Sequence, residues 1–88
     1  MKAKKVVLVQ PVTDEDILRL PRGQRAPEGW VRTHSTSRYS MWIRENKGNA
    51  RLTILPTKRA YLLGAQHGVE PRWVGQCKFA FYVVEEEA

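Results

Sequence analysis

The sequence has one cysteine, Cys77, so an internal disulfide is excluded. It has two histidines, His34 and His67, and neither has a second potential ligand at the spacing of a metal-binding motif. The glycine-rich phosphate loop and the nucleophile elbow are also missing. The sequence therefore predicts no metal, no cofactor and no catalytic set, and we expect a protein that is not an enzyme.

Long apolar runs are lacking as well. Residues 6–9 follow a lysine-rich start, but this run is far too short for a signal-peptide core or a membrane span. A lone cysteine and no secretory signal favour a reducing environment. We therefore expect a cytoplasmic protein with no membrane partner.

Acidic residues are scarce in the middle of the chain. Between Arg19 and Arg59 there are ten basic residues and two acidic ones, and the whole 88-residue chain has a formal net charge of +6. Three glutamates stand together at residues 85–87. Such a positive field attracts polyanions and speeds their encounter. We expect one compact basic domain, residues 1–84, and an acidic C-terminal tail, residues 85–88.

The N-terminal third predicts a strand and a short helix. The β-branched residues 6–9 favour a strand that is buried on both faces. Thr13 offers an N-cap, and the three acids after it complement the helix dipole. Pro21 ends this helix after one to two turns. Residues 21–29 then form a basic loop with two prolines, two glycines and two arginines.

The remainder predicts a hairpin, a second helix and a last strand. From Trp30 the chain is strand-like, and residues 39–45 and 51–55 flank an Asn-Lys-Gly-Asn hairpin turn. The second helix is expected from Pro56-Thr57 to about His67, where Gly68 stops it. Its Gly64 is expected to allow close packing on the sheet, and the last strand covers residues 78–84.

The order of these elements predicts an α+β protein. We expect a small antiparallel sheet of four to five strands with two helices on one face, in the order β-α-(β)ββ-α-β. A ferredoxin-like arrangement is the best single match, although residues 30–35 do not fit it neatly.

The hairpin carries the main candidate binding surface. If Lys47-Gly48 is its two-residue loop, Arg44 lies across from Arg51, and Trp42 shares their face, while Met41 and Ile43 point to the core on the other face. Two opposed arginines repel each other, and a bound anion would relieve this repulsion. An exposed tryptophan among arginines suits base stacking together with phosphate pairing. Alternatively the face is only solvated, and a register shift of one residue would move Trp42 into the core.

Other basic elements extend this surface. Two cations lie in the first turn of the second helix, where free backbone N–H groups can hold an anion. The basic loop would either bind a phosphate backbone or only make the protein more soluble. If Phe79, Phe81 and Val83 face the core, Lys78 and Tyr82 join the outer face. The candidate binding residues are Arg38, Trp42, Arg44, Lys47, Arg51, Lys58, Arg59, Lys78, Tyr82, Arg22 and Arg25.

One enzymatic alternative rests on a resemblance. Thr33-His34-Ser35 precedes the expected hairpin, and Thr53-Ile54-Leu55-Pro56 closes it before a helix. In this respect about a third of the chain resembles HicA-like ribonuclease toxins, although the glycine-serine before the histidine of that family is absent. The resemblance implies a catalytic role for His34, which is otherwise a surface strand residue.

The leading interpretation is a non-enzymatic nucleic-acid-binding domain for RNA or single-stranded DNA. No expected helix is long and basic enough to read a major groove. The alternative is a small phage- or plasmid-type inhibitor or regulator that binds the acidic surface of a host protein or a nucleoprotein complex, since Arg and Trp dominate interface hot spots. Sequence specificity and oligomeric state stay open.

Overall fold

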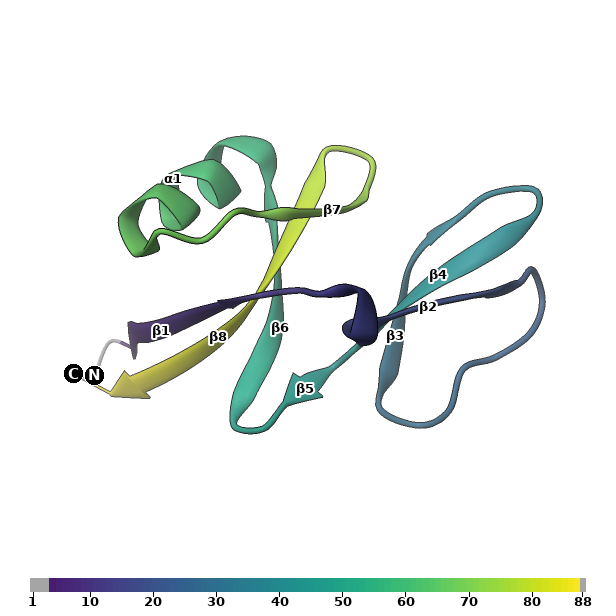
Figure 1. Cartoon of the computed structure of the whole chain (residues 1–88), viewed down its shortest axis with the longest axis horizontal. Helices are drawn as coiled ribbons and strands as arrows, with labels where there is room; N and C mark the ends of the chain where they lie inside the picture. Colours follow the sequence, from purple (N-terminus) through teal and green to yellow (C-terminus); the bar gives the residue numbers. More distant parts are fainter. Residues whose placement is uncertain (1–3, 88) are drawn as a thin grey trace.

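The computed structural model describes residues 4–87 and shows a mostly β protein with two sheets and one α-helix (Figure 1). The expectation of two helices on one face of a ferredoxin-like sheet is therefore wrong. The elements in chain order are β1 (Lys4–Pro11), the 3-10 turn η1 (Asp14–Asp16), β2 (Ile17–Pro21), β3 (Trp30–Ser35), β4 (Tyr39–Arg44), β5 (Asn46–Lys47), β6 (Ala50–Pro56), α1 (Thr57–His67), β7 (Arg72–Gly75) and β8 (Lys78–Glu87).

The first sheet has five strands and is built around β8. Strand β6 pairs with one edge of β8, and β5 extends the sheet beyond β6. Strands β1 and β7 pair with successive parts of the other edge. Residues 85–87, expected in an acidic tail, are the end of β8 and lie opposite residues 4–6 of β1.

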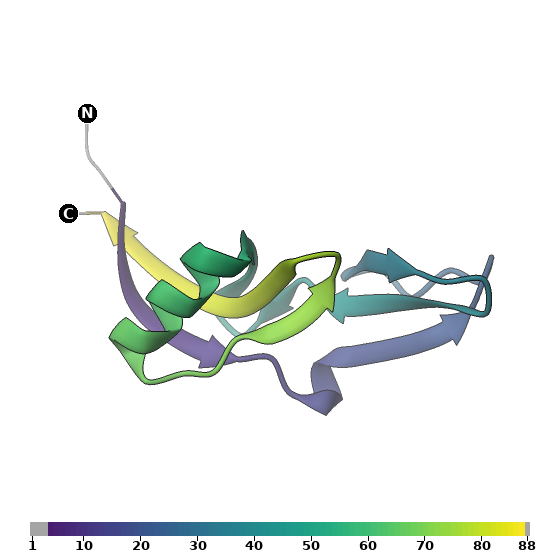
Figure 2. The same cartoon turned by 90° about the horizontal axis from the view of Figure 1, so that it is seen from above.

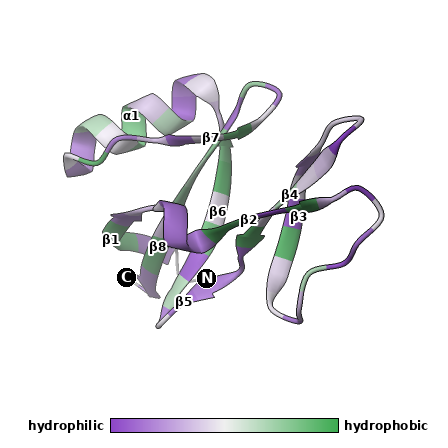
Figure 3. Cartoon of the chain, turned by 45° about the vertical axis from the view of Figure 1, so that its right-hand side comes forward, coloured by the Kyte–Doolittle hydropathy of each residue, from purple (hydrophilic) through white to green (hydrophobic). Residues whose placement is uncertain are grey.

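Both faces of β8 are buried because each supports a separate cluster. Phe81 and Val83 pack with Val9 and with Ala60 of α1. On the opposite face, Tyr82 packs with residues of the second sheet. Strands β6 and β8 are largely hydrophobic, and the loops at the far end of the second sheet are mostly polar (Figure 3). The expectation that Tyr82 faces solvent is thus wrong, because its face of β8 covers the second sheet.

Strand β1 also differs from its expected burial. Val9 is buried, whereas Val7 and Leu8 are 38% and 46% exposed. The register with β8 shifts between Val6 and Leu8, as at a β-bulge. Strand β1 lies at the edge of the sheet, so the expectation of a strand buried on both faces is wrong.

The second sheet has three strands in the order β2-β4-β3 (Figure 2). Both outer strands run antiparallel to β4, so β2 and β3 are parallel to each other. The connection between parallel strands must return along the length of the sheet. Residues 22–29 make this return and are called the crossover loop below. Gly23 and Gly29, with φ of 92° and 94°, supply the left-handed backbone near its two ends.

The first expected helix is replaced by η1 and strand β2. Thr13 does cap a turn: its backbone N–H and its hydroxyl each donate to Asp16 Oδ2 over 3.0 Å. The helix ends after one 3-10 turn because the following residues pair with β4, with Ile17 opposite Ile43. Pairing buries Ile17 against the core, and a helix cut short by Pro21 would not.

The expected hairpin register is also wrong. The turn is Gly48-Asn49, and β5 places Asn46 opposite Arg51. The chain changes sheets at Glu45, whose N–H donates to the Gly29 carbonyl over 2.7 Å and whose carbonyl accepts from Leu52 over 2.9 Å. Strand β4 therefore pairs with β2 and β3 rather than with β6.

Helix α1 matches its expected bounds and packs on the first sheet. Gly68 has a φ of 67° and ends it, donating to the Gly64 carbonyl. Gly64 is buried, and a Cβ at this position would collide with the Val69 carbonyl oxygen and lie 3.3 Å from the Phe81 ring. The close packing expected of Gly64 is thus present.

Gly64→Ala is expected to lower the free energy of unfolding by about 1–3 kcal/mol. The backbone oxygen of Val69 cannot turn aside as a flexible side chain would, so the helix must shift. Ala65→Gly, at an exposed position beside it, is the control and should cost about 1 kcal/mol through helix propensity alone. Urea unfolding would measure both, and an unchanged Gly64→Ala protein would contradict the tight packing.

Candidate nucleic-acid interface

Strand β4 divides its side chains between the two faces of the second sheet. Met41 and Ile43 are buried in the core, and this part of the expected alternation is confirmed. The neighbouring Trp42 points to the opposite face, called the outer face below. Its cross-strand partners are Leu18 of β2 and Arg32 of β3. An aromatic ring and a guanidinium therefore lie side by side on this face.

The crossover loop and the outer face enclose a cleft of about 530 Å³, called the Trp42 cleft. Gly23, Gln24 and Arg25 of the loop line one side, and Arg32 and Trp42 of the sheet line the other. The cleft combines an aromatic surface with two cations, the composition that suits a base and its phosphates.

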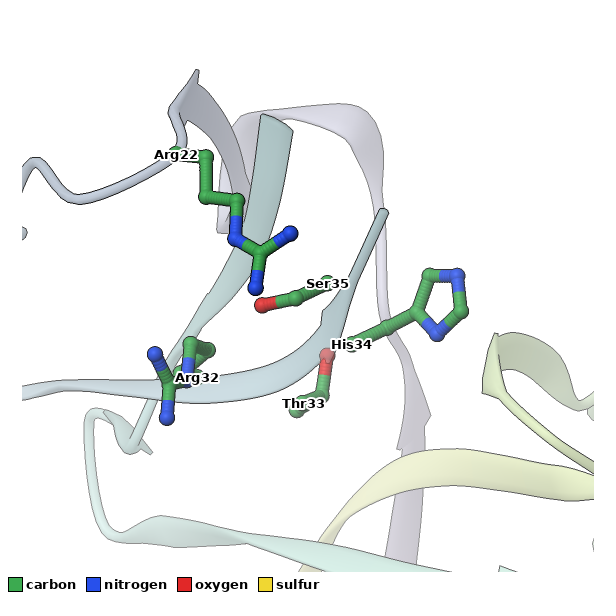
Figure 4. A pocket seen from close by; sticks show the side chains of 5 residues that line it. All are labelled: Arg22, Arg32, Thr33, His34 and Ser35. Carbon is green, nitrogen blue, oxygen red and sulfur yellow. The ribbon is translucent and has the colours of Figure 1, made fainter. Parts of the chain in front are cut away.

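A second hollow of about 310 Å³, called the Arg22 pocket, adjoins the first and shares Arg32 with it. Its other lining residues are Arg22, Thr33, His34 and Ser35 (Figure 4). The Arg22 guanidinium is directed toward the Ser35 hydroxyl, and Arg32 lies on the same side of β3. His34 points away from them.

The arginines of the two hollows differ from Arg44, Lys47 and Arg72, which are the cations that form ion pairs within residues 4–87. Arg22, Arg25 and Arg32 are exposed, and none of them forms an ion pair with any residue from 4 to 87. No acidic side chain lines either hollow. Three unneutralised guanidinium groups therefore line two adjoining hollows, which creates a local positive potential for an anion.

Trp42 has an unsatisfied polar atom. Its indole Nε1 is buried and has no hydrogen-bond partner in the described part of the chain. Such a donor costs about 1–3 kcal/mol relative to a paired one. Besides the backbone bonds at its ends, Arg22 and Gly29, the crossover loop has one turn bond within residues 4–87, in which the Gln24 N–H donates to the Pro21 carbonyl over 3.0 Å.

Arg44 and Lys47 instead surround the buried carboxylate of Asp16. Arg44 Nε lies 3.3 Å from Asp16 Oδ1, an ion pair without aligned hydrogen-bond geometry, and Lys47 Nζ lies 3.1 Å from Oδ2. Burial raises the pKa of Asp16, but hydrogen bonds from Thr13 and Lys47 outweigh this effect, so its pKa is lowered. Arg44 also stacks over Trp30.

Tyr82 belongs to the same cluster. It is fully buried, and its hydroxyl donates to the Arg44 carbonyl over 2.7 Å. Burial and the nearby Asp16 charge raise the pKa of this phenol. The cluster of Asp16, Arg44, Lys47 and Tyr82 joins η1, β4, β5 and β8. Three predicted binding residues, Arg44, Lys47 and Tyr82, therefore connect the two sheets.

The other predicted residues are dispersed. Arg51 lies opposite Asn46 and Val83 in the first sheet, so it does not face Arg44. Lys58 and Arg59 are exposed at the start of α1, and Lys78 is exposed at the start of β8. Arg38, in the turn between β3 and β4, accepts a backbone bond from Arg22 but lines neither hollow. Of the predicted set, the structure brings together Arg22, Arg25 and Trp42.

His34 contacts the first sheet. Its ring packs edge-on against Trp73 of β7, with ring centroids 5.2 Å apart. The backbone of β7 approaches closely here, since a Cβ on Gly75 would lie 3.1 Å from the Thr33 carbonyl oxygen. His34 thus has a packing contact between the two sheets.

Arg32 and Ser35 are site residues that sequence reasoning missed. Both lie in the segment that did not fit the expected fold. Arg32 reaches the site because β3 pairs with β4 through the short turn of residues 36–38, whereas we expected residues 39–45 to pair with residues 51–55. The available signal was its position in a strand-like run that follows a basic loop.

The comparisons add no identity. No protein-family model, no curated protein and no solved structure matches the chain. Within residues 4–87, no group of three or more His, Cys, Asp or Glu residues is placed to hold a metal ion. None of the helices in that range has the length and apolar character to cross a membrane.

Proposed function

We propose that the protein binds single-stranded nucleic acid, RNA in the first place, on the outer face of its second sheet. The observation that carries the proposal is the Trp42 cleft, where an indole and the unpaired Arg25 and Arg32 line one hollow. Every base has a face that can stack on an indole, while guanidinium groups pair with the flanking phosphates.

The shape of the site favours a single strand over a duplex. Its cations come from a loop and from a short strand, and α1 has Lys58 and Arg59 at one end only. A major-groove reader would instead present a helix with basic residues along its length. Stacking on Trp42 also requires an unpaired base.

We further propose that the protein binds nucleic acid without catalysing a reaction, and that it does so in the cytoplasm. His34 packs on Trp73 and points away from Arg22 and Arg32, so it is badly placed to act on a strand in the Trp42 cleft. Cys77 is a free and exposed thiol, which suits a reducing compartment.

Fluorescence anisotropy with a labelled single-stranded RNA of about 12 nucleotides tests the proposal. Binding should weaken steeply between about 50 and 200 mM salt, with a slope near −2 in log K against log salt, because about three phosphates are neutralised. A matched duplex of the same sequence should bind more weakly.

Two results would contradict this function. An affinity that does not change with salt would contradict the proposed phosphate contacts. An absence of RNA binding at low salt would contradict the proposed function itself. In the second case, tight binding to an acidic protein would favour the alternative function, an inhibitor or regulator that uses the same arginines.

A further inference from the structure

The Arg22 pocket has a different character from the Trp42 cleft beside it. No large apolar side chain lines it, and two of its five lining residues are arginines. At about 310 Å³ it is also the smaller hollow. It therefore suits a compact anion rather than a base.

A hydroxyl pair supplies the pocket with a further donor. Ser35 Oγ and Ser40 Oγ are 2.9 Å apart, and either can donate to the other. Ser40 is 2% exposed, and Ser35 provides its side-chain hydrogen bond within the described residues. When Ser40 donates to Ser35, the proton of Ser35 is free for an anion on the side toward which Arg22 points.

The charge of the pocket matches a phosphate monoester better than a diester. A terminal phosphate has a charge of about −1.5 to −2 at pH 7, and an internal diester of the backbone has one negative charge. Arg22 and Arg32 offer two positive charges with no acid beside them. Guanidinium groups also fit phosphate oxygens in a bidentate way.

We infer that the Arg22 pocket binds the terminal phosphate monoester of a single-stranded nucleic acid. This inference rests on the proposed function, because Arg32 lines both hollows and so links them into one nucleotide-sized site. The terminal base lies in the Trp42 cleft, and its phosphate lies between Arg22 and Arg32. The protein would thereby recognise the end of a strand.

Three RNAs of one sequence test the inference: one with a 5′-phosphate, one with a 3′-phosphate and one with hydroxyls at both ends. We expect a phosphate on one end to tighten binding about tenfold, the gain typical of an added charge-assisted contact. The identity of that end defines the direction of the strand.

Arg22→Gln locates the effect. In this variant the preference for the phosphorylated end should fall to about onefold, while the RNA with two hydroxyl ends still binds. Arg59→Gln removes the same charge from α1, so it is the matched control and should keep the full preference. Both positions are exposed, and thermal melts would show that the variants fold.

The outcomes separate this inference from the proposed function. Equal binding of the three RNAs by the unmodified protein would overturn the terminal-phosphate site and leave the proposed function standing. A preference that survives in Arg22→Gln would also overturn it. No binding of any RNA would overturn both.

Discussion

Replacing Asp16 with asparagine is expected to lower the free energy of unfolding by about 2–4 kcal/mol at neutral pH. The side chain is 3% exposed and lies between Arg44 and Lys47, so the change leaves two cations without their partner. These cations are partly exposed, which keeps the loss below that of a fully buried pair. Urea unfolding of Asp16→Asn beside the unmodified protein measures it.

The pH dependence identifies the charge as the cause. The folded-state pKa of Asp16 is lowered from its ordinary 3.8, so its contribution is complete above about pH 4 and is lost as the pH falls through the lowered folded value. The two proteins should therefore converge in stability in acid. Asp14→Asn is the control, because Asp14 pairs with Arg72 but is 88% exposed, and its loss should matter little. An Asp16→Asn protein as stable as the original at pH 7 would show that the charged cluster around Asp16 does not hold the two sheets together.

Arg32→Gln is expected to weaken binding of single-stranded RNA about 10- to 100-fold, the loss that follows from charge-assisted hydrogen bonds. Arg32 lines both hollows, so its removal affects the base-binding and the phosphate-binding parts together. The fold should be unaffected, since Arg32 is exposed and forms no ion pair with residues 4–87.

Arg59→Gln provides the comparison for Arg32→Gln as well. It changes the net charge equally but lies on α1, so it should weaken binding by no more than about threefold through long-range attraction alone. Equal losses in the two variants would show that general charge, rather than the outer face, holds the RNA.

Local patterns predicted those parts of the fold that depend on neighbours in sequence. The bounds of α1 follow from Pro56 and Gly68, and the burial of Met41 and Ile43 follows from alternation, whichever strand pairs with β4. The Thr13 cap formed as well, although the residues after it became a strand.

Non-local pairing decided the rest. Residues 17–20 suit a helix or a strand, and their pairing with β4 selects the strand. The change of sheet at Glu45 separates Arg44 from Arg51, and Asp16, 28 residues before Arg44 in the chain, neutralises it. Trp42 and the loop arginines were predicted as candidates, but Trp42 lies beside Arg32 because β3 pairs with β4, and the loop arginines reach Arg32 because of the crossover from β2 to β3. Such contacts follow from topology, which local sequence periodicity does not contain.

The most direct measurement of the central claim is an NMR titration of the three indole N–H signals with single-stranded RNA, each assigned by a Trp→Phe variant. Trp42 adjoins the cleft, Trp30 stacks under Arg44 on the same sheet, and Trp73 lies on the first sheet against His34. We predict the largest shift for Trp42, because a base stacks on its indole or its unpaired Nε1–H gains an acceptor, and the smallest shift for Trp73. RNA binding that shifts Trp73 and leaves Trp42 unchanged would contradict a nucleic-acid site on the outer face.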